Sequence, residues 1–215
     1  MHVDIFSDTI CPWCFIGKRQ FEEALRMRPQ PDLVVRWRTF QLNPQMPLGG
    51  MDRNSYLAAK FGGAANAARI YYNIYQMGQS VGLDFNFEHI ERTPNTLKSH
   101  ELLHFAAQNG GQDRLVERLF ELYFKEGANI GELNVLLGAT ADVGLDPDAA
   151  RAALESGSAR ENVEAEDQQA REAGIQGVPT FIFNGRYALS GAQEAKVLAQ
   201  MFDLPREEHV GSSAV

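Results

Sequence analysis

The two cysteines of this chain fall in one tetrapeptide, Cys11-Pro12-Trp13-Cys14. Disulfide exchange passes through a mixed disulfide, so one thiol must attack as a thiolate and a second must lie close enough to resolve the intermediate. Two intervening residues on the first turn of a helix meet that need. The spacing therefore predicts a redox-active dithiol in which Cys11 attacks and the more buried Cys14 resolves.

The residues around the tetrapeptide support this interpretation. A strand pattern ends near Ser7, and a helical pattern begins near Pro12, which suits the first helical position because proline has no N–H group to leave unpaired. Cys11 would then lie at the helix N-terminus, where unpaired backbone N–H groups and the helix dipole favour a negative sulfur. We expect Cys11 to be the nucleophile.

Zinc binding is an alternative explanation of the same spacing. A Cys-x-x-Cys pair can form half of a zinc site, and His100 and His104 at helical spacing would complete two cysteines and two histidines. The two pairs are far apart in the chain, and the tight spacing of a zinc finger is absent. We therefore predict no metal, and we expect the two histidines to be packed or capping residues. Two inert core cysteines are a further, weaker alternative.

A second notable residue is Pro179, which begins a strand-like run after Gly177-Val178. Proline at the first residue of a strand cannot donate to the ladder and marks an edge or a special turn. Thioredoxin-like folds place a cis-proline here, facing the dithiol, and the backbone of the preceding residue pairs with the substrate chain. We predict a cis Val178–Pro179 bond, with an ordinary trans-proline as the alternative.

Strand-like and helical segments alternate at both ends of the chain. Residues 3–7 and 33–40 show strand periodicity, and residues 15–25 between them fit a helix, which together predict a βαβ unit. Near the C-terminus the strand-like runs 179–183 and 186–190 flank Asn-Gly, a strong hairpin signal, and a helix is predicted over 193–202.

The middle of the chain is rich in helix-forming residues. Asp146, before a proline, and Ser158 are predicted N-caps. The predicted helices cover residues 56–82, 96–109, 113–125, 132–143, 147–155 and 159–173. The fold class is therefore α/β, a thioredoxin-like βαβ…ββα fold with a large all-helical insertion. We expect a thioredoxin-like domain over 1–45 plus 174–205, a helical insertion domain over 46–173, and a flexible tail over 206–215.

Composition narrows the function classes. With 28 acidic against 20 basic residues the formal charge is −8, which argues against a nucleic-acid partner. No apolar run reaches the roughly 18 residues of a membrane span, and the N-terminus does not read as a secretory signal. The expected location is the cytoplasm, where structural disulfides are rare. That expectation strengthens a redox role for the cysteines.

Four runs resemble the DsbA-like thioredoxin superfamily and, within it, the FrnE-type dithiol-disulfide isomerases. This resemblance implies a thiol-disulfide oxidoreductase/isomerase with Cys11 as nucleophile, Cys14 as resolving thiol and Pro179 as the cis-proline. Pro12, Trp13, Val178, Ser190 and Gly191 are then the expected substrate-binding residues, and Trp13, Phe15 and Val178 would form an apolar rim. The runs are residues 6–18 (FSDTICPWCFIGK), 95–100 (NTLKSH), 174–181 (GIQGVPTF) and 190–193 (SGAQ).

A sister branch resembles the chain with a serine in place of Cys11. This branch comprises the kappa-class glutathione transferases and the 2-hydroxychromene-2-carboxylate isomerases. It suggests an alternative, a glutathione-dependent isomerase or transferase acting on a small aromatic substrate, with a glutathione groove at Val178 and the Ser190-Gly191 turn. The presence of both thiols favours redox exchange. Pro12-Trp13 lacks the histidine of the strongly oxidising DsbA enzymes, so strong oxidising power is not expected.

Partners and cofactors follow from the same resemblance. We expect a disulfide-containing protein or a small-molecule thiol as the substrate. No tightly bound cofactor is predicted, although glutathione could act as a co-substrate. Isomerases of related folds are often dimers, so a homodimer is compatible with this function.

Overall fold

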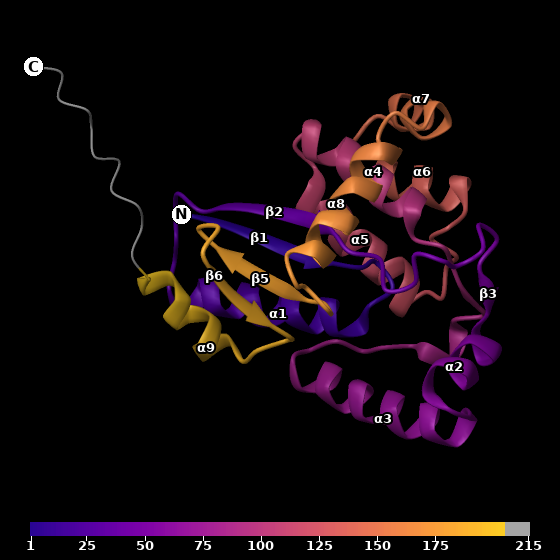
Figure 1. Ribbon diagram of the computed structural model, residues 1–215, viewed down its shortest axis with the longest axis horizontal. Helices are drawn as coiled ribbons and strands as arrows, with labels where there is room; N and C mark the ends of the chain where they lie inside the picture. Colours follow the sequence, from indigo (N-terminus) through magenta and orange to yellow (C-terminus); the bar gives the residue numbers. More distant parts are fainter. Residues whose placement is uncertain (205–215) are drawn as a thin grey trace, which may run out of the picture.

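A four-stranded sheet forms the centre of the molecule in the computed structural model, which describes residues 1–204 (Figure 1). The sheet has the order β2-β1-β5-β6. β1 and β2 run parallel, and β5 is antiparallel to both β1 and β6. A parallel pair needs a crossover connection, which α1 supplies. These elements are β1 (His2–Ser7), α1 (Pro12–Met27), β2 (Val34–Thr39), β5 (Thr180–Phe183) and β6 (Tyr187–Ser190).

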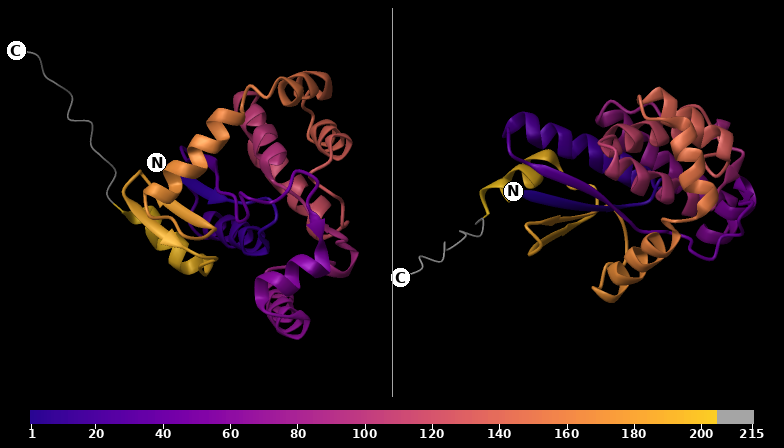
Figure 2. Two further views of the ribbon diagram at one scale, coloured as in Figure 1. Left: turned by 45° about the vertical axis from the view of Figure 1, so that its right-hand side comes forward. Right: turned by 90° about the horizontal axis from the view of Figure 1, so that it is seen from above.

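Helices cover both faces of this sheet (Figure 2). α1 and α9 (Ala195–Gln200) pack together on one face, and α8 (Arg160–Glu172) lies on the other. Phe21 of α1 stacks on Phe181 of β5 with ring centroids 5.7 Å apart. The predicted βαβ…ββα arrangement is confirmed, and its core lies between the sheet and α1.

The segment between β2 and β5 is helical apart from two short antiparallel strands. Its helices form two groups, with α2 and α3 on one side of the sheet edge and α4 to α8 on the other (Figure 1). The elements are β3 (Met51–Asp52), α2 (Arg53–Phe61), α3 (Ala64–Ser80), a 3₁₀ turn (Phe87–His89), β4 (Arg92–Thr93), α4 (Leu97–Gln108), α5 (Gln112–Phe124), α6 (Leu133–Asp142) and α7 (Pro147–Ser156).

Three sequence expectations about these helices need correction. The helix predicted over 56–82 is two helices, because Gly62 and Gly63 adopt φ values of +73° and +123° that end one helix before the next begins. Ser158 is not an N-cap: α8 is capped by Ala159 without a side-chain hydrogen bond, and the Ser158 N–H donates to Ser156 in the preceding turn. The last predicted helix is shorter, and a 3₁₀ turn occupies 201–203.

Other local expectations hold. The Asp146 carboxylate accepts hydrogen bonds from the N–H groups of Asp148 and Ala149, as an N-cap does. Asn184 and Gly185 form the β5–β6 turn, both with positive φ, which is the conformation a tight hairpin requires. The predicted tail over 206–215 lies outside the described residues. Among residues 1–204, no helix has the length and apolar character needed to cross a bilayer.

The insertion is fastened to the outer strand β2. The Trp37 N–H donates to the Gln112 side chain of α5 at 3.0 Å, and that side chain returns a hydrogen bond to the Trp37 carbonyl. The Thr39 N–H donates to Glu166 of α8 at 2.6 Å. These side chains satisfy an edge that would otherwise present unpaired backbone groups. The helices therefore hold the sheet end that carries the dithiol loop.

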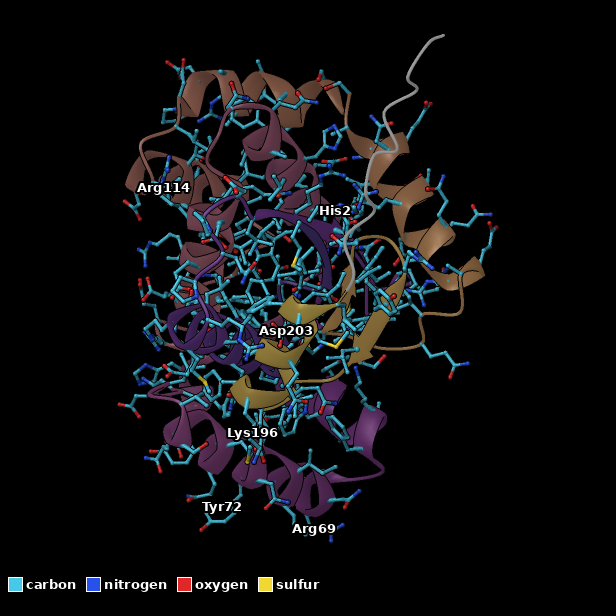
Figure 3. All side chains as sticks on the ribbon, turned by 90° about the vertical axis from the view of Figure 1, so that its left-hand side faces the viewer. His2, Arg69, Tyr72, Arg114, Lys196 and Asp203 are labelled. Carbon is cyan, nitrogen blue, oxygen red and sulfur yellow. The ribbon has the colours of Figure 1, made fainter. Side chains whose placement is uncertain are left out.

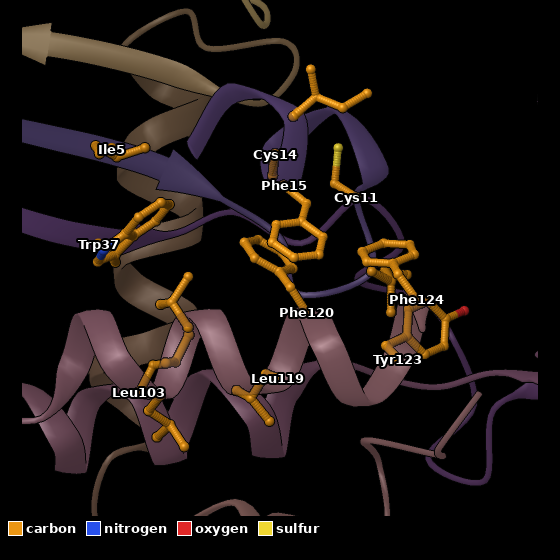
Figure 4. Close-up of a cluster of buried hydrophobic side chains, with 14 of the residues drawn as sticks. Ile5, Cys11, Cys14, Phe15, Trp37, Leu103, Leu119, Phe120, Tyr123 and Phe124 are labelled. Atoms are coloured by element: carbon orange, nitrogen blue, oxygen red, sulfur yellow. The ribbon is translucent and has the colours of Figure 1, made fainter. Parts of the chain in front are cut away.

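The joint between α1 and α5 is both aromatic and ionic. Phe15 of α1 stacks on Phe120 of α5 with ring centroids 5.0 Å apart (Figure 4). Beside them, the buried Lys18 ammonium lies 3.1 Å from Glu117 and 3.4 Å from Asp113, and it also pairs with Glu22. A buried lysine needs such partners, because an unpaired charge in the interior is costly. The first turns of α1 are thereby fixed against the insertion.

Candidate active site

The two thiols lie at the start of α1, as the spacing predicts. Cys11 is the N-cap, with extended backbone angles, and Pro12 is the first helical residue. The Cys11 carbonyl accepts a hydrogen bond from the Cys14 N–H at 3.0 Å, which begins the helical turn. Both thiols are free, and Cys14 is fully buried whereas Cys11 is 3% exposed. The expected order of burial is confirmed.

The environment of Cys14 keeps its thiol protonated. Burial, then hydrogen bonding with Cys11 and the charge of Cys11, raise the pKa of the Cys14 thiol well above its usual value. The Ser7 side chain and the Asp8 backbone oppose this rise but do not outweigh it. A thiolate is the attacking species in disulfide exchange, so Cys14 is poorly suited to attack first. This fits its expected role as the resolving thiol.

The loop before β5 faces the dithiol. The Val178–Pro179 peptide bond is cis, as predicted, and the Cys11 thiol donates to the Val178 carbonyl at 3.5 Å. The Gly191 N–H donates to the Pro179 carbonyl at 2.7 Å, and Ser190 Oγ lies 3.4 Å from Thr180 Oγ1. The structure thus places the Val178 carbonyl beside Cys11, and it joins Gly191 and Ser190 to the next two residues of the same loop and strand, Pro179 and Thr180.

Gly17 allows this loop to come close to α1. A Cβ atom at this position would lie 2.8 Å from Cγ of Pro179, nearer than side-chain carbons approach one another. The next contact is the Phe181 ring, at 3.4 Å from the same point. Only glycine leaves room for the proline ring over the second turn of α1. Sequence reasoning gave this residue no role, because its constraint comes from a residue far along the chain.

Residues from α4 anchor the loop that leads into Cys11. Asp8 is fully buried, and its carboxylate accepts from the Leu42 N–H at 2.7 Å and lies 3.3 Å from Nε2 of His100. The hydroxyls of Thr9 and Ser99 are 2.7 Å apart. The Asp8 carbonyl in turn accepts from the Cys11 N–H at 3.0 Å. The insertion therefore positions the loop that carries the nucleophile.

The model of the family described as DSBA-like thioredoxin domain matches residues 2–203 of this chain. The chain belongs to that family. The resemblance seen in the four sequence runs is thereby confirmed, together with the mixed α/β thioredoxin fold and its large helical content.

Three known proteins are similar to this DsbA-like chain over nearly its whole length. The uncharacterized protein YwbO of Bacillus subtilis (strain 168) is 31% identical over 193 residues, covering 89% of this chain and 90% of YwbO. A probable DsbA oxidoreductase from Streptomyces coelicolor has a TM-score of 0.88 and 28% identity, covering 100% and 95% of the two chains. The cytosolic disulfide reductase DsbM from Pseudomonas aeruginosa, solved with GSH, has a TM-score of 0.66 and 20% identity, covering 94% and 95%.

The three side chains that were expected to form an apolar rim differ in their exposure to solvent. Trp13 is 37% exposed and Val178 is half-buried, so both are open to a substrate of a DsbA-like protein. Phe15 is fully buried in the aromatic cluster with Phe120 and Phe124 (Figure 4). Its expected place in the apolar rim is therefore wrong. It lies on the side of α1 that packs against α5, so it belongs to the core beneath the dithiol.

The two histidines considered as zinc ligands have other partners. His100 is buried against Asp8, and His104 lies 3.0 Å from the Gln108 side chain on the outer part of α4. Within residues 1–204, no group of three or more His, Cys, Asp or Glu side chains is arranged to hold a metal ion. His100 is a packed residue that positions the dithiol loop, which agrees with the expectation from the sequence.

Proposed function

We propose that this DsbA-like protein is a thiol-disulfide oxidoreductase/isomerase of the FrnE type, acting through Cys11 and Cys14. The observation that carries the proposal is the position of the Cys11 sulfur, which begins a helix and lies 3.5 Å from the carbonyl before cis-Pro179. Catalysis then needs no tightly bound cofactor, because the dithiol itself carries the two electrons.

The exchange reaction proceeds in two displacements. The Cys11 thiolate attacks one sulfur of the substrate disulfide, forms a mixed disulfide, and releases the other sulfur as a thiolate. Cys14 then loses its proton to solvent and attacks the Cys11 sulfur, which releases the second substrate thiolate and leaves a Cys11–Cys14 disulfide. The substrate has been reduced by two electrons and the protein oxidised by two. If a different thiolate of the substrate instead attacks the substrate sulfur of the mixed disulfide, a new substrate disulfide forms and Cys11 is released as a thiolate, which is isomerisation.

Substrate binding is assigned to the residues that surround Cys11. The Val178 backbone offers hydrogen bonds to an extended substrate chain, in the manner of an added strand. Trp13 supplies exposed apolar surface next to the nucleophile, and Pro12 fixes the start of the helix. Ser190 and Gly191 would extend this binding surface, since they contact Thr180 and Pro179.

Insulin reduction by dithiothreitol tests this proposal. Cys11→Ser should lower the catalysed rate to the uncatalysed background, because the attacking sulfur is gone. Cys14→Ser should accumulate one mixed disulfide per chain, seen as an added substrate mass, and the double variant should accumulate none. Wild-type turnover by Cys11→Ser would refute the proposal. Refolding of scrambled ribonuclease by the wild-type protein reports the isomerase part separately.

Glutathione-dependent chemistry on a small aromatic substrate is the second candidate. The observation that favours it is the similarity to DsbM, which was solved with GSH. It predicts a thermal shift with millimolar glutathione and turnover that survives Cys14→Ser. If glutathione produces no shift, this candidate is lost.

The cytoplasmic location and the homodimer stay predictions.

A further inference from the structure

A cavity of about 1100 Å³ lies between α2, α3 and the segment that follows α3. This volume is slightly above the roughly 300–1,000 Å³ that small-molecule sites commonly enclose, so the cavity has room for a small molecule. Five of the lining residues are aromatic, and Arg53 at the start of α2 adds a guanidinium. The aromatic lining residues are Tyr71, Tyr72, Tyr75, Phe85 and Phe87.

Arg53 is a buried cation whose charge is not balanced. Its side chain is 4% exposed, and Nη1 donates to the hydroxyls of Thr93 and Tyr123, both at 3.2 Å. Nε and Nη2 are buried without a hydrogen-bond partner. In the part of the chain that the structure describes, no carboxylate lies within ion-pair distance of this guanidinium. Buried charges are ordinarily paired, so Arg53 lacks an anion.

The other charged groups of the cavity do not supply that anion. The Lys125 ammonium is 2.9 Å from Glu121 and is therefore already paired. Asp84 and Glu88 line the cavity but are exposed, so water screens them. The interior of the cavity is thus positive and aromatic, whereas its rim is acidic.

The cavity adjoins the helix that carries the dithiol. Phe85 in its wall contacts Phe15, the residue after Cys14, with ring centroids 6.1 Å apart. Tyr71 covers the guanidinium of Arg53, whose Cζ lies 4.9 Å from the ring centroid. Burial raises the pKa of Tyr71, Arg53 opposes this, and the charge of Cys11 adds to the rise. Tyr71 is therefore in contact with Arg53 and near enough to the Cys11 sulfur to be affected by its charge.

We propose that this cavity binds the carboxylate-bearing aromatic part of a small disulfide substrate, with Arg53 as the partner of the carboxylate and the substrate sulfur at Cys11. This inference rests on the proposed dithiol chemistry and names its substrate class. The planar guanidinium can offer Nε and Nη2 side by side to one carboxylate. Both nitrogens are buried, so the proposal requires the Tyr71 ring to move aside when the substrate binds.

Two aromatic disulfides of different charge form a direct test. Dithiobis(nitrobenzoate) carries a carboxylate on each ring, whereas dithiodipyridine is neutral at neutral pH. In each case the Cys11 thiolate attacks the disulfide and releases one aryl thiolate, and Cys14 displaces the second. The stopped-flow rate constants of both probes are measured for the wild-type protein and for Arg53→Gln. We expect Arg53→Gln to lower the ratio of the benzoate rate to the pyridine rate about tenfold, the value of a charge-assisted hydrogen bond.

Arg69→Gln is the matched control. Arg69 points outward from α3 (Figure 3), donates a hydrogen bond to the Asn66 side chain at 2.8 Å, and does not line the cavity. It removes the same single charge from a chain of net charge −8, so it reproduces any general effect on an anionic probe. An unchanged ratio in Arg53→Gln, or an equal fall in Arg69→Gln, would overturn the carboxylate site. If wild-type protein releases fewer than two aryl thiolates from either probe, the proposed dithiol chemistry fails instead.

Equilibrium binding gives a second test that needs neither a reaction nor the loss of Arg53. Nitrobenzoate should raise the melting temperature of wild-type protein, and the neutral nitrobenzamide should not. Ala68→Trp fills the cavity from an exposed position on α3, so it should abolish the shift with nitrobenzoate. Equal shifts with acid and amide, or a shift that persists in Ala68→Trp, would contradict the site.

Discussion

Two buried cations separate the structural region of this molecule from the region that we assign to substrate selection. Lys18, in the helix that carries the dithiol, is surrounded by carboxylates of Glu22, Asp113 and Glu117. Arg53, in the wall of the cavity, has two hydroxyl partners and, among residues 1–204, no carboxylate partner. Both side chains are 4% exposed, so burial alone does not distinguish them.

The difference lies in where each charge finds its anion. The chain itself neutralises Lys18, which ties α1 to α5 and holds the first turn of α1 in place. The charge of Arg53 is left for a ligand to neutralise. A buried charge that is paired within the fold indicates a structural element, whereas an unpaired one beside a cavity indicates a binding site. Three changes test this comparison, from the largest expected effect to the smallest.

Gly17→Ala tests whether α1, which Lys18 fixes in place, must stay in close contact with the loop that carries Pro179. The added methyl group would lie 2.8 Å from Pro179 and push the cis-proline loop away from α1. A misplacement near 1 Å can cost about 100-fold in rate, and we expect a loss of that order in insulin reduction. Gly138→Ala is the control, because a Cβ there meets nothing within 4 Å and the variant should keep full activity. A wild-type rate in Gly17→Ala would show that the close approach does not matter.

Lys18→Met and Arg53→Met compare the two cations by stability. Removing Lys18 takes the shared ammonium from Glu22, Asp113 and Glu117, of which only Glu22 and Glu117 keep Arg19 as a partner. Because these carboxylates are partly exposed, we expect a loss of about 2 kcal/mol. Arg53→Met removes an unbalanced buried charge, so it should cost less than about 1 kcal/mol or stabilise the fold. Urea unfolding measures both values. A larger loss for Arg53→Met than for Lys18→Met would reverse the assignment of the two regions.

The smallest of the expected effects is a dependence of stability on pH, which comes from the ion pairs around Lys18. Burial alone would raise the pKa of Glu117, but hydrogen bonding and charge from Arg19 and Lys18 outweigh it and lower that pKa. A carboxyl with a lowered folded-state pKa stabilises the fold above its unfolded value, and this contribution is lost as the pH falls. Between about pH 6 and pH 3, wild-type protein should therefore lose more stability than Lys18→Met. Parallel pH curves would contradict this.

Local sequence patterns predicted the parts of the site that depend on neighbouring residues. The cysteine spacing, Pro12 at the first helical position and the Asn-Gly hairpin each depend on chemistry within a few residues. The cis bond before Pro179 followed from the fold implied by the dithiol. Each of these features could be predicted from a short stretch of sequence or from the fold that it implied, and the structure confirms their geometry.

The remaining features depend on contacts between distant residues. Gly17 is constrained by Pro179, and Asp8 by His100, and neither constraint leaves a periodic signal in the sequence. Phe15 was placed on the rim because its position next to the dithiol does not indicate which side of α1 faces the core. Arg53 attracted no attention, since a single arginine at a helix start is ordinary until its burial and its missing carboxylate are seen together.

A redox titration of the wild-type protein tests the dithiol most directly. The protein is equilibrated in buffers of reduced and oxidised glutathione, alkylated, and weighed by mass spectrometry. We predict one two-electron transition, from a species with both Cys11 and Cys14 alkylated to a species with neither, because Cys14 resolves the mixed disulfide that glutathione forms with Cys11. Two alkyl groups per chain in every buffer, or glutathione permanently attached to Cys11 without release by Cys14, would contradict the account.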